Sequence, residues 1–355
     1  MSNAVSVAQY GSSNPTMRNR IINGAMVINQ RNGTNPTLVT VDNQYTLDRW
    51  TYRTAQLSKL TSTQSTNAPA GFSYSAQTSV TTSATPGSTD YVTFKQLIEG
   101  YNIADLNWGT ANAKPLTISF WVYSSVAGTY GYRLINATGP SAYVMQYTVS
   151  ANTWTYVTQT VTGPTSGTFG NTNGEGVSIQ FDLGSGSSFQ TSTLNSWITG
   201  DYIRASGNVQ LITNASANWY VTGVQIESGT TATPFEYRQY GTEFMLCQRY
   251  YQTLSNNTYG LSVIGGVGPS NSIFHVYLPV TMRNAPNASG GGNTNTYYFN
   301  SVGGALQSAS LAYSAFNVQA NITSLRFYTS TAYGASGTSS WNDWNTFYIN
   351  LTAEL

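Results

Sequence analysis

The chain has 355 residues, of which only 8% are charged, and its formal net charge is +1. An ordinary soluble domain has about 25% charged residues, and a nucleic-acid-binding protein needs a basic face, so this balance disfavours a nucleic-acid partner. The aromatic content of 13% argues against a disordered chain, and no stretch approaches the ~20 apolar residues of a membrane-spanning helix. One cysteine, Cys247, and one histidine, His275, exclude an internal disulfide and a cysteine- or histidine-rich metal site.

The N-terminal 24 residues lack apolar periodicity, and residues 11–15 form a run of turn-favouring residues. We expect residues 1–24 to form an extended arm that is either disordered or docked into a partner protein. Arg18 and Arg20 are its only charged residues and therefore the candidate docking residues. The first ten residues contain neither a basic nor an apolar segment, so we expect no secretion signal and assembly in a cytoplasm.

Residues 25–236 repeatedly alternate apolar and polar side chains, which is the pattern of half-buried β-strands. The clearest run places four apolar residues on one face, Leu116, Ile118, Phe120 and Val122. Trp121 lies on the opposite face, so we expect it to cover a second layer or to meet a partner. Polar turn clusters separate the alternating runs, and the sequence therefore predicts an all-β jelly roll, a form of β-sandwich, over 25–236.

Residues 237–252 contain the one convincing helical pattern, which we expect to connect two β regions. Tyr240, Phe244, Cys247 and Tyr251 follow the spacing of a helical stripe, and Thr242 is the candidate N-cap. Cys247 on that stripe is most simply a buried apolar residue.

Residues 253–355 return to strand alternation and predict a C-terminal β domain. The alternating residues include Phe274, Val276 and Leu278, and later Ile349 and Leu351. The run from Asn284 to Asn295 is rich in glycine and predicts an exposed loop.

Eight segments have distinctive sequences: Arg18–Arg31 (RNRIINGAMVINQR), Tyr45–Trp50 (YTLDRW), Ile98–Thr110 (IEGYNIADLNWGT), Phe120–Tyr123 (FWVY), Phe181–Gly186 (FDLGSG), Thr222–Glu227 (TGVQIE), Thr233–Arg238 (TPFEYR) and Cys247–Tyr251 (CQRYY). Together they resemble a widespread family of phage tail-fibre and virion-appendage proteins. The resemblance covers residues 18–252 and implies a jelly roll similar to a carbohydrate-binding module. It does not by itself imply that this jelly roll binds sugar. Within these segments, we interpret Glu236 and Arg238 as residues that orient the chain into the helix.

Acid–base hydrolysis of a polysaccharide needs two carboxylates about 5–10 Å apart. The first β region offers five candidates, Glu99, Asp105, Glu175, Asp182 and Asp201, but no spacing singles out a pair. The C-terminal domain has only Asp343 and Glu354. We therefore expect a protein that is not an enzyme, with no catalytic residue. We also expect no cofactor. A structural calcium would suit a jelly roll through oxygen ligands, but no motif in the sequence specifies a calcium site.

Sugar binding fits the composition better, because sugar C–H faces stack on aromatic rings and hydroxyls pair with polar side chains. The candidate glycan-binding residues are Trp341, Asp343 and Trp344, in a region that follows a Gly/Ser-rich loop, and Tyr297 and Tyr298. The alternative for these residues is a structural tryptophan corner or a contact between subunits.

The sequence therefore predicts a phage virion appendage, a tail fibre or related fibre, that binds host-surface polysaccharide without covalent chemistry. The resemblance implies a homotrimer, docked through its N-terminal arm to another virion protein, with the C-terminal domain as the receptor-binding tip. One alternative is a structural virion subunit, such as a head fibre, decoration or adaptor protein, without receptor binding. A second alternative is a polysaccharide depolymerase.

Overall fold

The computed structural model describes residues 17–255, 262–267, 272–291, 293–299, 306–312, 316–329, 339–343 and 348–355, and the side chains of 17–254, 276–290, 319–326 and 348–355. The fold is all-β, as predicted, and the chain divides into two compact units between Glu243 and Phe244. Among the described residues, no helix has both the length and the apolar character needed to cross a bilayer.

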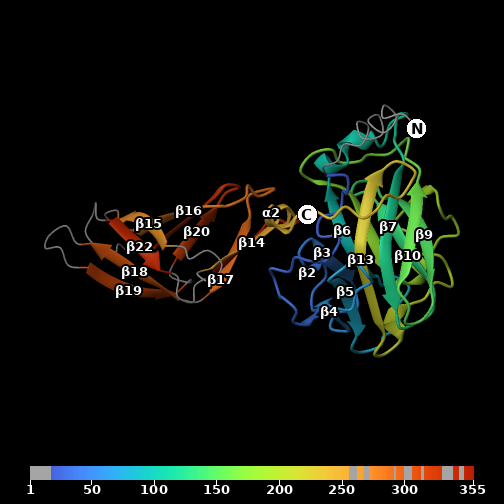
Figure 1. Ribbon diagram of the computed structural model, residues 1–355, viewed down its shortest axis with the longest axis horizontal. Helices are drawn as coiled ribbons and strands as arrows, with labels where there is room; N and C mark the ends of the chain where they lie inside the picture. The colour runs from blue at the N-terminus through green and yellow to red at the C-terminus, as the bar shows by residue number, and fades with distance from the viewer. Residues whose placement is uncertain are drawn as a thin grey trace, which may run out of the picture. The chain divides into compact units, whose positions relative to one another are not determined.

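The first unit is a sandwich of two antiparallel sheets (Figure 1). The six-stranded sheet has the order β1 (Thr37–Leu38), β4 (Leu60–Ser65), β5 (Ser75–Val80), β13 (Asn218–Ser228), β7 (Leu116–Ser124) and β10 (Thr155–Val161). The seven-stranded sheet has the order β12 (Trp197–Thr199), β9 (Ser141–Val149), β8 (Gly128–Ile135), β11 (Glu175–Asp182), β6 (Val92–Glu99), β3 (Trp50–Thr54) and β2 (Gln44–Leu47). Short 3-10 turns at Gly100–Asn102 (η1), Ala104–Leu106 (η2), Ser187–Phe189 (η3) and Leu211–Thr213 (η4) lie in the connections.

The core of this unit lies between the two sheets. Leu116, Ile118, Phe120 and Val122 on β7 are each 0% exposed, which confirms the predicted apolar face. Aromatic rings from both sheets meet there, and Phe120 lies 5.1 Å from Phe181 of β11 between ring centroids. Each such side chain contributes about 1.5–3 kcal/mol of transfer free energy. The inner faces of the two sheets therefore hold the sandwich together.

The expected extended arm is wrong for residues 17–24. Ile21 is fully buried, and residues 20–24 lie beside β13: the Arg20 N–H donates to the Ile226 carbonyl at 2.8 Å and the Val224 N–H to Gly24 at 3.0 Å. The physical reason is that β5 pairs with β13 only as far as Val221, which leaves backbone groups for this segment to satisfy. Residues 1–16 lie outside the described residues.

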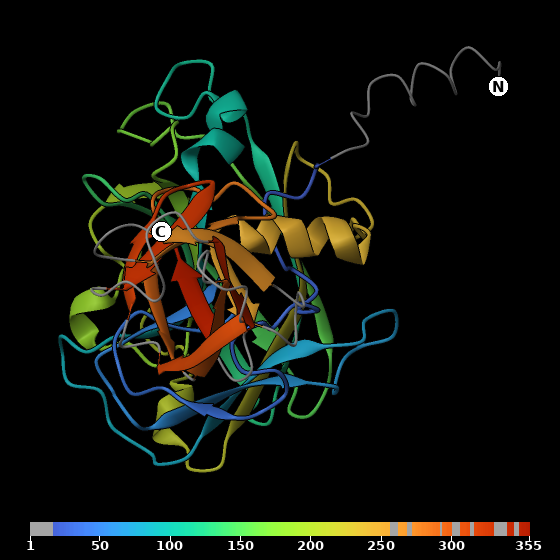
Figure 2. The ribbon, with the colours of Figure 1, turned by 90° about the vertical axis from the view of Figure 1, so that its left-hand side faces the viewer.

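Helix α2 (Tyr240–Gln248) is shorter than the predicted 237–252 (Figure 2). Cys247 is buried as expected, but Tyr240 is 64% exposed and Tyr251 belongs to a strand, so the predicted stripe is wrong at both ends. The Tyr250 N–H donates to the Cys247 carbonyl at 2.9 Å in the turn that follows the helix. Thr242 lies inside α2 and is not its N-cap.

The second unit contains two further antiparallel sheets. The smaller has the order β14 (Tyr251–Ser255), β23 (Tyr348–Thr352) and β17 (Asn287–Gly291). The larger has the order β19 (Leu306–Ala312), β18 (Asn293–Phe299), β22 (Ser339–Asp343), β15 (Ser262–Val267), β16 (Ser272–Tyr277), β21 (Ser324–Thr329) and β20 (Phe316–Ala320). The predicted loop from Asn284 to Asn295 instead contains β17, because pairing with β23 uses backbone groups that glycine supplies as well as any residue.

Candidate functional site

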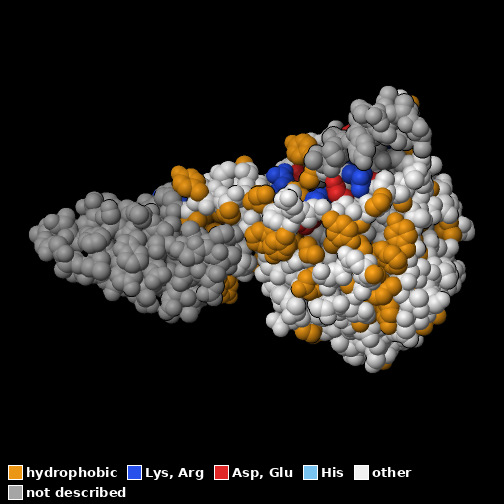
Figure 3. All heavy atoms as spheres, viewed as in Figure 1, with side chains coloured by type: hydrophobic (Ala, Val, Ile, Leu, Met, Phe, Trp, Pro, Cys, Tyr) orange, Lys and Arg blue, Asp and Glu red, His pale blue; other side chains and the backbone are white. Residues whose placement is uncertain are grey.

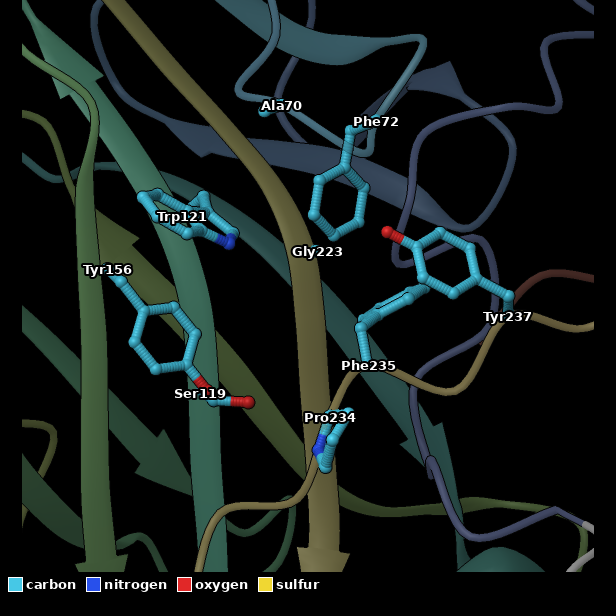
Figure 4. Close-up of a pocket in the computed structure, with 9 residues that line it drawn as sticks. All are labelled: Ala70, Phe72, Ser119, Trp121, Tyr156, Gly223, Pro234, Phe235 and Tyr237. Carbon is cyan, nitrogen blue, oxygen red and sulfur yellow. The ribbon is translucent and has the colours of Figure 1, made fainter.

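An open cleft of about 350 Å³ lies on the outer face of the six-stranded sheet (Figure 4). Strands β7, β10 and β13, the β4–β5 connection and the segment after β13 supply its lining, which is Ser119, Trp121, Tyr156, Gly223, Ala70, Phe72, Pro234, Phe235 and Tyr237. None of these nine side chains is charged. Five are aromatic, so the cleft is an apolar surface that solvent can reach.

Two walls of aromatic rings border the cleft. Trp121 and Tyr156 are direct partners in the β7–β10 register, with ring centroids 5.2 Å apart. On the opposite wall Phe235 packs 5.1 Å from Phe72 and 5.0 Å from Tyr237, again between ring centroids. Figure 4 shows the two walls facing one another across the cleft. A flat ligand can contact aromatic faces on both sides.

Gly223 forms the floor between these walls. The β13–β7 register shifts between Thr222 and Gln225, so Gly223 lies in a β-bulge with a φ of +61°. A Cβ at this position would lie 2.6 Å from Cζ of Phe72. Glycine is therefore required both by the left-handed backbone conformation and by the close approach of the wall.

Two polar groups face the cleft without a protein partner. Ser119 is only 3% exposed, and among the described residues no hydrogen bond involves its hydroxyl or the indole N–H of Trp121. Figure 4 shows both groups turned toward the interior of the cleft. By contrast, the Tyr237 hydroxyl donates to the Gly71 carbonyl at 2.8 Å, which fixes that ring. Unsatisfied groups of this kind are available to ligand hydroxyls.

Further aromatic residues lie on the same face beyond the cleft. Figure 3 shows exposed hydrophobic side chains on the surface of the sandwich. Tyr123 follows Trp121 by two residues on β7, which places the two Cα atoms about 7 Å apart on one face. Its ring lies 5.6 Å from Trp154 and 5.2 Å from Tyr220, its register partner on β13. The Tyr123 hydroxyl donates to Oδ1 of Asn152 at 3.0 Å. The aromatic surface therefore extends beyond the cleft.

The outer face of the seven-stranded sheet has the opposite character. Arg133 of β8 is 0% exposed, donates to Oε1 of Gln180 at 2.9 Å and forms an ion pair with Asp201 at 2.7 Å. Asp201 also pairs with Arg53 at 2.8 Å. Burial lowers the pKa of Arg133 to about 10, although Asp201 opposes that change. The β12–β13 connection supplies Asp201 and closes this face around a charged network.

The geometry gives no support to acid–base chemistry in the cleft. The structure describes all five carboxylates of the first unit that the sequence offered as candidates, and none of them lines the cleft. Within the described ranges, no three His, Cys, Asp or Glu side chains form a group that could hold a metal ion.

The predicted C-terminal residues are placed in part. Strands β18 and β22 pair so that Tyr297 lies opposite Trp341, Tyr298 opposite Ser340 and Asn295 opposite Asp343. The register thus brings an aromatic residue of each strand together, while Trp344 and the side chains of the other four candidates lie outside the described residues.

The two predicted docking arginines both contact the sandwich. Arg18 donates to the Pro234 carbonyl at 2.9 Å and pairs with Glu227 at 3.2 Å, and Arg20 pairs with Asp105 at 2.8 Å.

Sequence reasoning missed most of the cleft. The position of Trp121 on the polar face of its strand does indicate an exposed aromatic residue. Phe235 and Tyr237 lie two residues apart in an extended segment, which puts them on one side, but their segment predicts only a structural role. Phe72 and Tyr156 carry no pattern that marks them.

No protein-family model matches the sequence, and no curated protein matches it. Among solved structures, the chain is similar to the enzymatically active domain of tailspike protein 4 of bacteriophage CBA120, with 15% identity and a TM-score of 0.33 over 60% of this chain and 22% of that one. The carbohydrate-binding module CBM4 is 17% identical, with a TM-score of 0.31 over 58% of this chain and 98% of that one. A family 11 carbohydrate-binding module from Clostridium thermocellum, in complex with a beta-1,3-1,4-mixed-linked tetrasaccharide, is 11% identical, with a TM-score of 0.29 over 55% and 97%. Similarities this weak assign neither a family nor a ligand.

Proposed function

We propose that this protein binds a neutral glycan non-covalently in the cleft on the outer face of the six-stranded sheet. The observation that carries the proposal is the pair of facing aromatic walls, together with two unpartnered polar groups, the Ser119 hydroxyl and the Trp121 indole N–H, that face the cleft. Sugar rings offer apolar faces for stacking and hydroxyls for hydrogen bonding. The volume of about 350 Å³ falls in the usual range for small-molecule sites.

The absence of charge among the lining residues selects the class of sugar. A glycan with carboxylate or phosphate groups would have to give up their hydration without gaining a cationic partner in the cleft. A neutral sugar loses only hydroxyl hydration, which the polar groups of the cleft can replace. We therefore expect neutral surface polysaccharides to bind more tightly than acidic ones.

The biological setting that we propose is a phage virion appendage, a tail fibre or related fibre, that attaches to host-surface polysaccharide. Its support is the set of motifs between residues 18 and 252. The protein would be a homotrimer docked to another virion protein through its N-terminal residues. Several identical clefts on one fibre would raise weak sugar contacts to useful avidity through effective concentration.

The C-terminal domain is a second candidate for receptor contact. The observation in its favour is the register of β18 and β22, which places Tyr297 directly opposite Trp341. Asp343, Tyr298 and Trp344 remain proposed members of that site.

One experiment separates these proposals. The full chain is titrated with neutral oligosaccharides from the host surface by calorimetry, and released reducing ends are measured in the same tube. We expect saturable binding without release, at least about 30-fold weaker binding in Trp121→Ala, and unchanged binding in the matched Trp341→Ala variant.

Each of the other outcomes supports a different site or function for this protein. Loss of binding in Trp341→Ala alone would move the site to the C-terminal domain. Release of reducing ends would indicate a depolymerase. An absence of binding by the folded wild-type protein would overturn the proposal and favour a structural virion subunit.

A further inference from the structure

The segment that forms one wall of the cleft has two sides. Phe235 and Tyr237 face the cleft, whereas Glu236 and Arg238, which alternate with them, contact residues 18–23. One short extended segment therefore connects the ligand site with the N-terminal segment. We call Glu236, Arg238 and Glu243, together with their contacts to residues 18, 19, 21 and 23, the clasp.

Glu236 forms the first half of the clasp. Its carboxylate accepts the backbone N–H of Arg18 at 3.1 Å and that of Asn19 at 2.7 Å. In return, the Arg18 guanidinium donates to the carbonyl of Pro234, itself a lining residue of the cleft, at 2.9 Å. Charge-assisted bonds of this kind are roughly twice as strong as neutral ones, so the wall is held by strong, directional contacts.

Arg238 forms the second half. Its guanidinium donates to the Ile21 carbonyl at 3.0 Å and to the Asn19 carbonyl, and it pairs with Glu243 at 3.2 Å. Glu243 in turn accepts the Asn23 backbone N–H. The Arg238 side chain is only 6% exposed. Because a buried charge that loses its partners is strongly destabilising, the contacts of Arg238 are costly to break.

The N-terminal segment is itself fixed to the floor of the cleft. The Asn19 side chain donates to the Val224 carbonyl at 3.0 Å and accepts the Ile226 N–H at 3.0 Å. Val224 follows Gly223, the residue that forms the floor. The N-terminal segment thus ties the floor to the wall.

The wall and the clasp also share a small pocket of about 60 Å³, which is lined by Asn19, Phe235 and Glu236 among others. Packing against the wall is therefore incomplete on this side, and the polar contacts of the clasp contribute to its position.

From this geometry we infer that residues 18–23 position the Phe235–Tyr237 wall, so that the N-terminal segment controls the affinity of the cleft for its ligand. Arg18, Glu236 and Arg238 are positioning residues in this inference, which rests on the proposed function. Coupling of this kind is reciprocal. Opening the clasp weakens glycan binding, and bound glycan stabilises the clasp.

The test compares full-chain variants on both sides of the clasp. Glu236→Gln removes the charge that both backbone N–H groups contact, and Arg18→Ala removes the bonds to Pro234 and Glu227. The matched control is Arg20→Ala, because Arg20 lies in the same segment but pairs with Asp105 and with the Asn102 carbonyl, away from the wall. We expect about tenfold weaker binding of a neutral oligosaccharide in both clasp variants and unchanged binding in the control.

Hydrogen exchange gives a second measurement, and its response to ligand would not change if the clasp had only a structural role. Ligand added to the wild-type protein should slow exchange at residues 18–23, and this protection should vanish in Glu236→Gln. Unchanged affinity in both clasp variants, with faster exchange at residues 233–238, would overturn the inference.

The proposed function and this inference fail in different ways. If the wild-type protein binds no glycan, the function fails, and faster exchange at 233–238 in Arg18→Ala but not in Arg20→Ala still supports the clasp. If Glu236→Gln does not fold, Arg18→Ala decides the inference, because it keeps both backbone bonds to Glu236.

Discussion

The two outer faces of the sandwich share one core but use opposite kinds of side chain. On the seven-stranded sheet, Arg133 and Asp201 lie in a charged network that the chain closes with its own β12–β13 connection. On the six-stranded sheet, uncharged rings such as Trp121 and Tyr156 line an open cleft. Charged side chains thus lie where the chain itself supplies their partners at fixed positions, and aromatic rings lie where a partner can come from outside.

Exposure supports this distinction. Tyr156 is 45% exposed and Tyr237 is 62% exposed, although each lies beside other rings. A contiguous apolar surface that solvent can reach marks an interaction site in soluble proteins. Arg133 is 0% exposed, so an external ligand cannot reach its side chain.

The largest effect is expected on the closed face. Arg133→Ala should lower the free energy of unfolding by about 2–5 kcal/mol, because the fully buried side chain leaves a cavity and Gln180 loses a buried hydrogen-bond partner. Urea unfolding measures this change, and hydrogen exchange shows whether β8 and β11 are destabilised. Glycan binding by the remaining folded protein should not change.

The matched substitution on the open face is Trp121→Ala. It should cost only about 1 kcal/mol of stability while it removes most of the glycan affinity. Equal stability losses on the two faces would contradict the division between a structural face and a binding face.

The next effect concerns the floor of the cleft. Gly223→Ala should cost about 1–3 kcal/mol, because alanine at a φ of +61° is strained, and should weaken glycan binding because the new Cβ meets Phe72 at 2.6 Å. The control is Gly33→Ala, which has a φ of +57° but no atom within 4 Å of the added Cβ. Calorimetry and urea unfolding of both variants separate strain from collision. Weaker binding in Gly33→Ala as well would show that the collision is not the cause.

A smaller, pH-dependent effect is expected at Asp201. Burial alone would raise the pKa of this carboxyl, but its hydrogen bonds with Arg53 and the charge of Arg133 hold it below its usual range. A lowered pKa stabilises the folded state above the unfolded value of about 3.9, and this contribution is lost as the pH falls through the lower folded value.

Asp201→Asn should therefore cost about 1–2 kcal/mol at neutral pH, less than a fully buried pair because the Asp201 side chain is 35% exposed. Urea unfolding from pH 7 to below pH 4 should show the two proteins converging at the acid end. A difference in stability between the two proteins that stays constant over this pH range would contradict the assignment of the effect to the Asp201 charge.

The smallest effect is expected on ligand binding when the salt concentration changes. Because no charged side chain lines the cleft, the Kd for a neutral oligosaccharide should change less than about twofold between about 0.05 and 0.5 M NaCl. Calorimetry at both concentrations measures it. A tenfold weakening in high salt would indicate a charged site elsewhere.

The fold was predictable where the alternation is strong. Strand β7 has Phe120 facing the core and Trp121 facing out, as period-two patterning requires. The burial of Ile21 was not predictable, because it depends on where β5 stops pairing with β13, which is a long-range property.

The candidate site was predictable only in part. The position of Trp121 followed from its strand, but the second wall comes from Phe72 and Phe235, which are 163 residues apart and meet only in the folded chain. Glu236 was assigned to the orientation of the helix, and Arg238 does join it to Glu243 of α2. The contacts of Glu236 with Arg18 and Asn19 span more than 200 residues of sequence, and no local sequence pattern predicts them.

The most direct test of the cleft follows the indole N–H resonances of the eight tryptophans by two-dimensional NMR while a neutral oligosaccharide is added. Single Trp→Phe variants assign the signals of Trp121, Trp219 and Trp341. We expect the Trp121 signal to shift in a saturable way. The signals of Trp341 and of Trp219, whose indole N–H donates to the Tyr147 hydroxyl in the core, should stay in place. A saturable shift of Trp341 with an unmoved Trp121 would contradict this expectation.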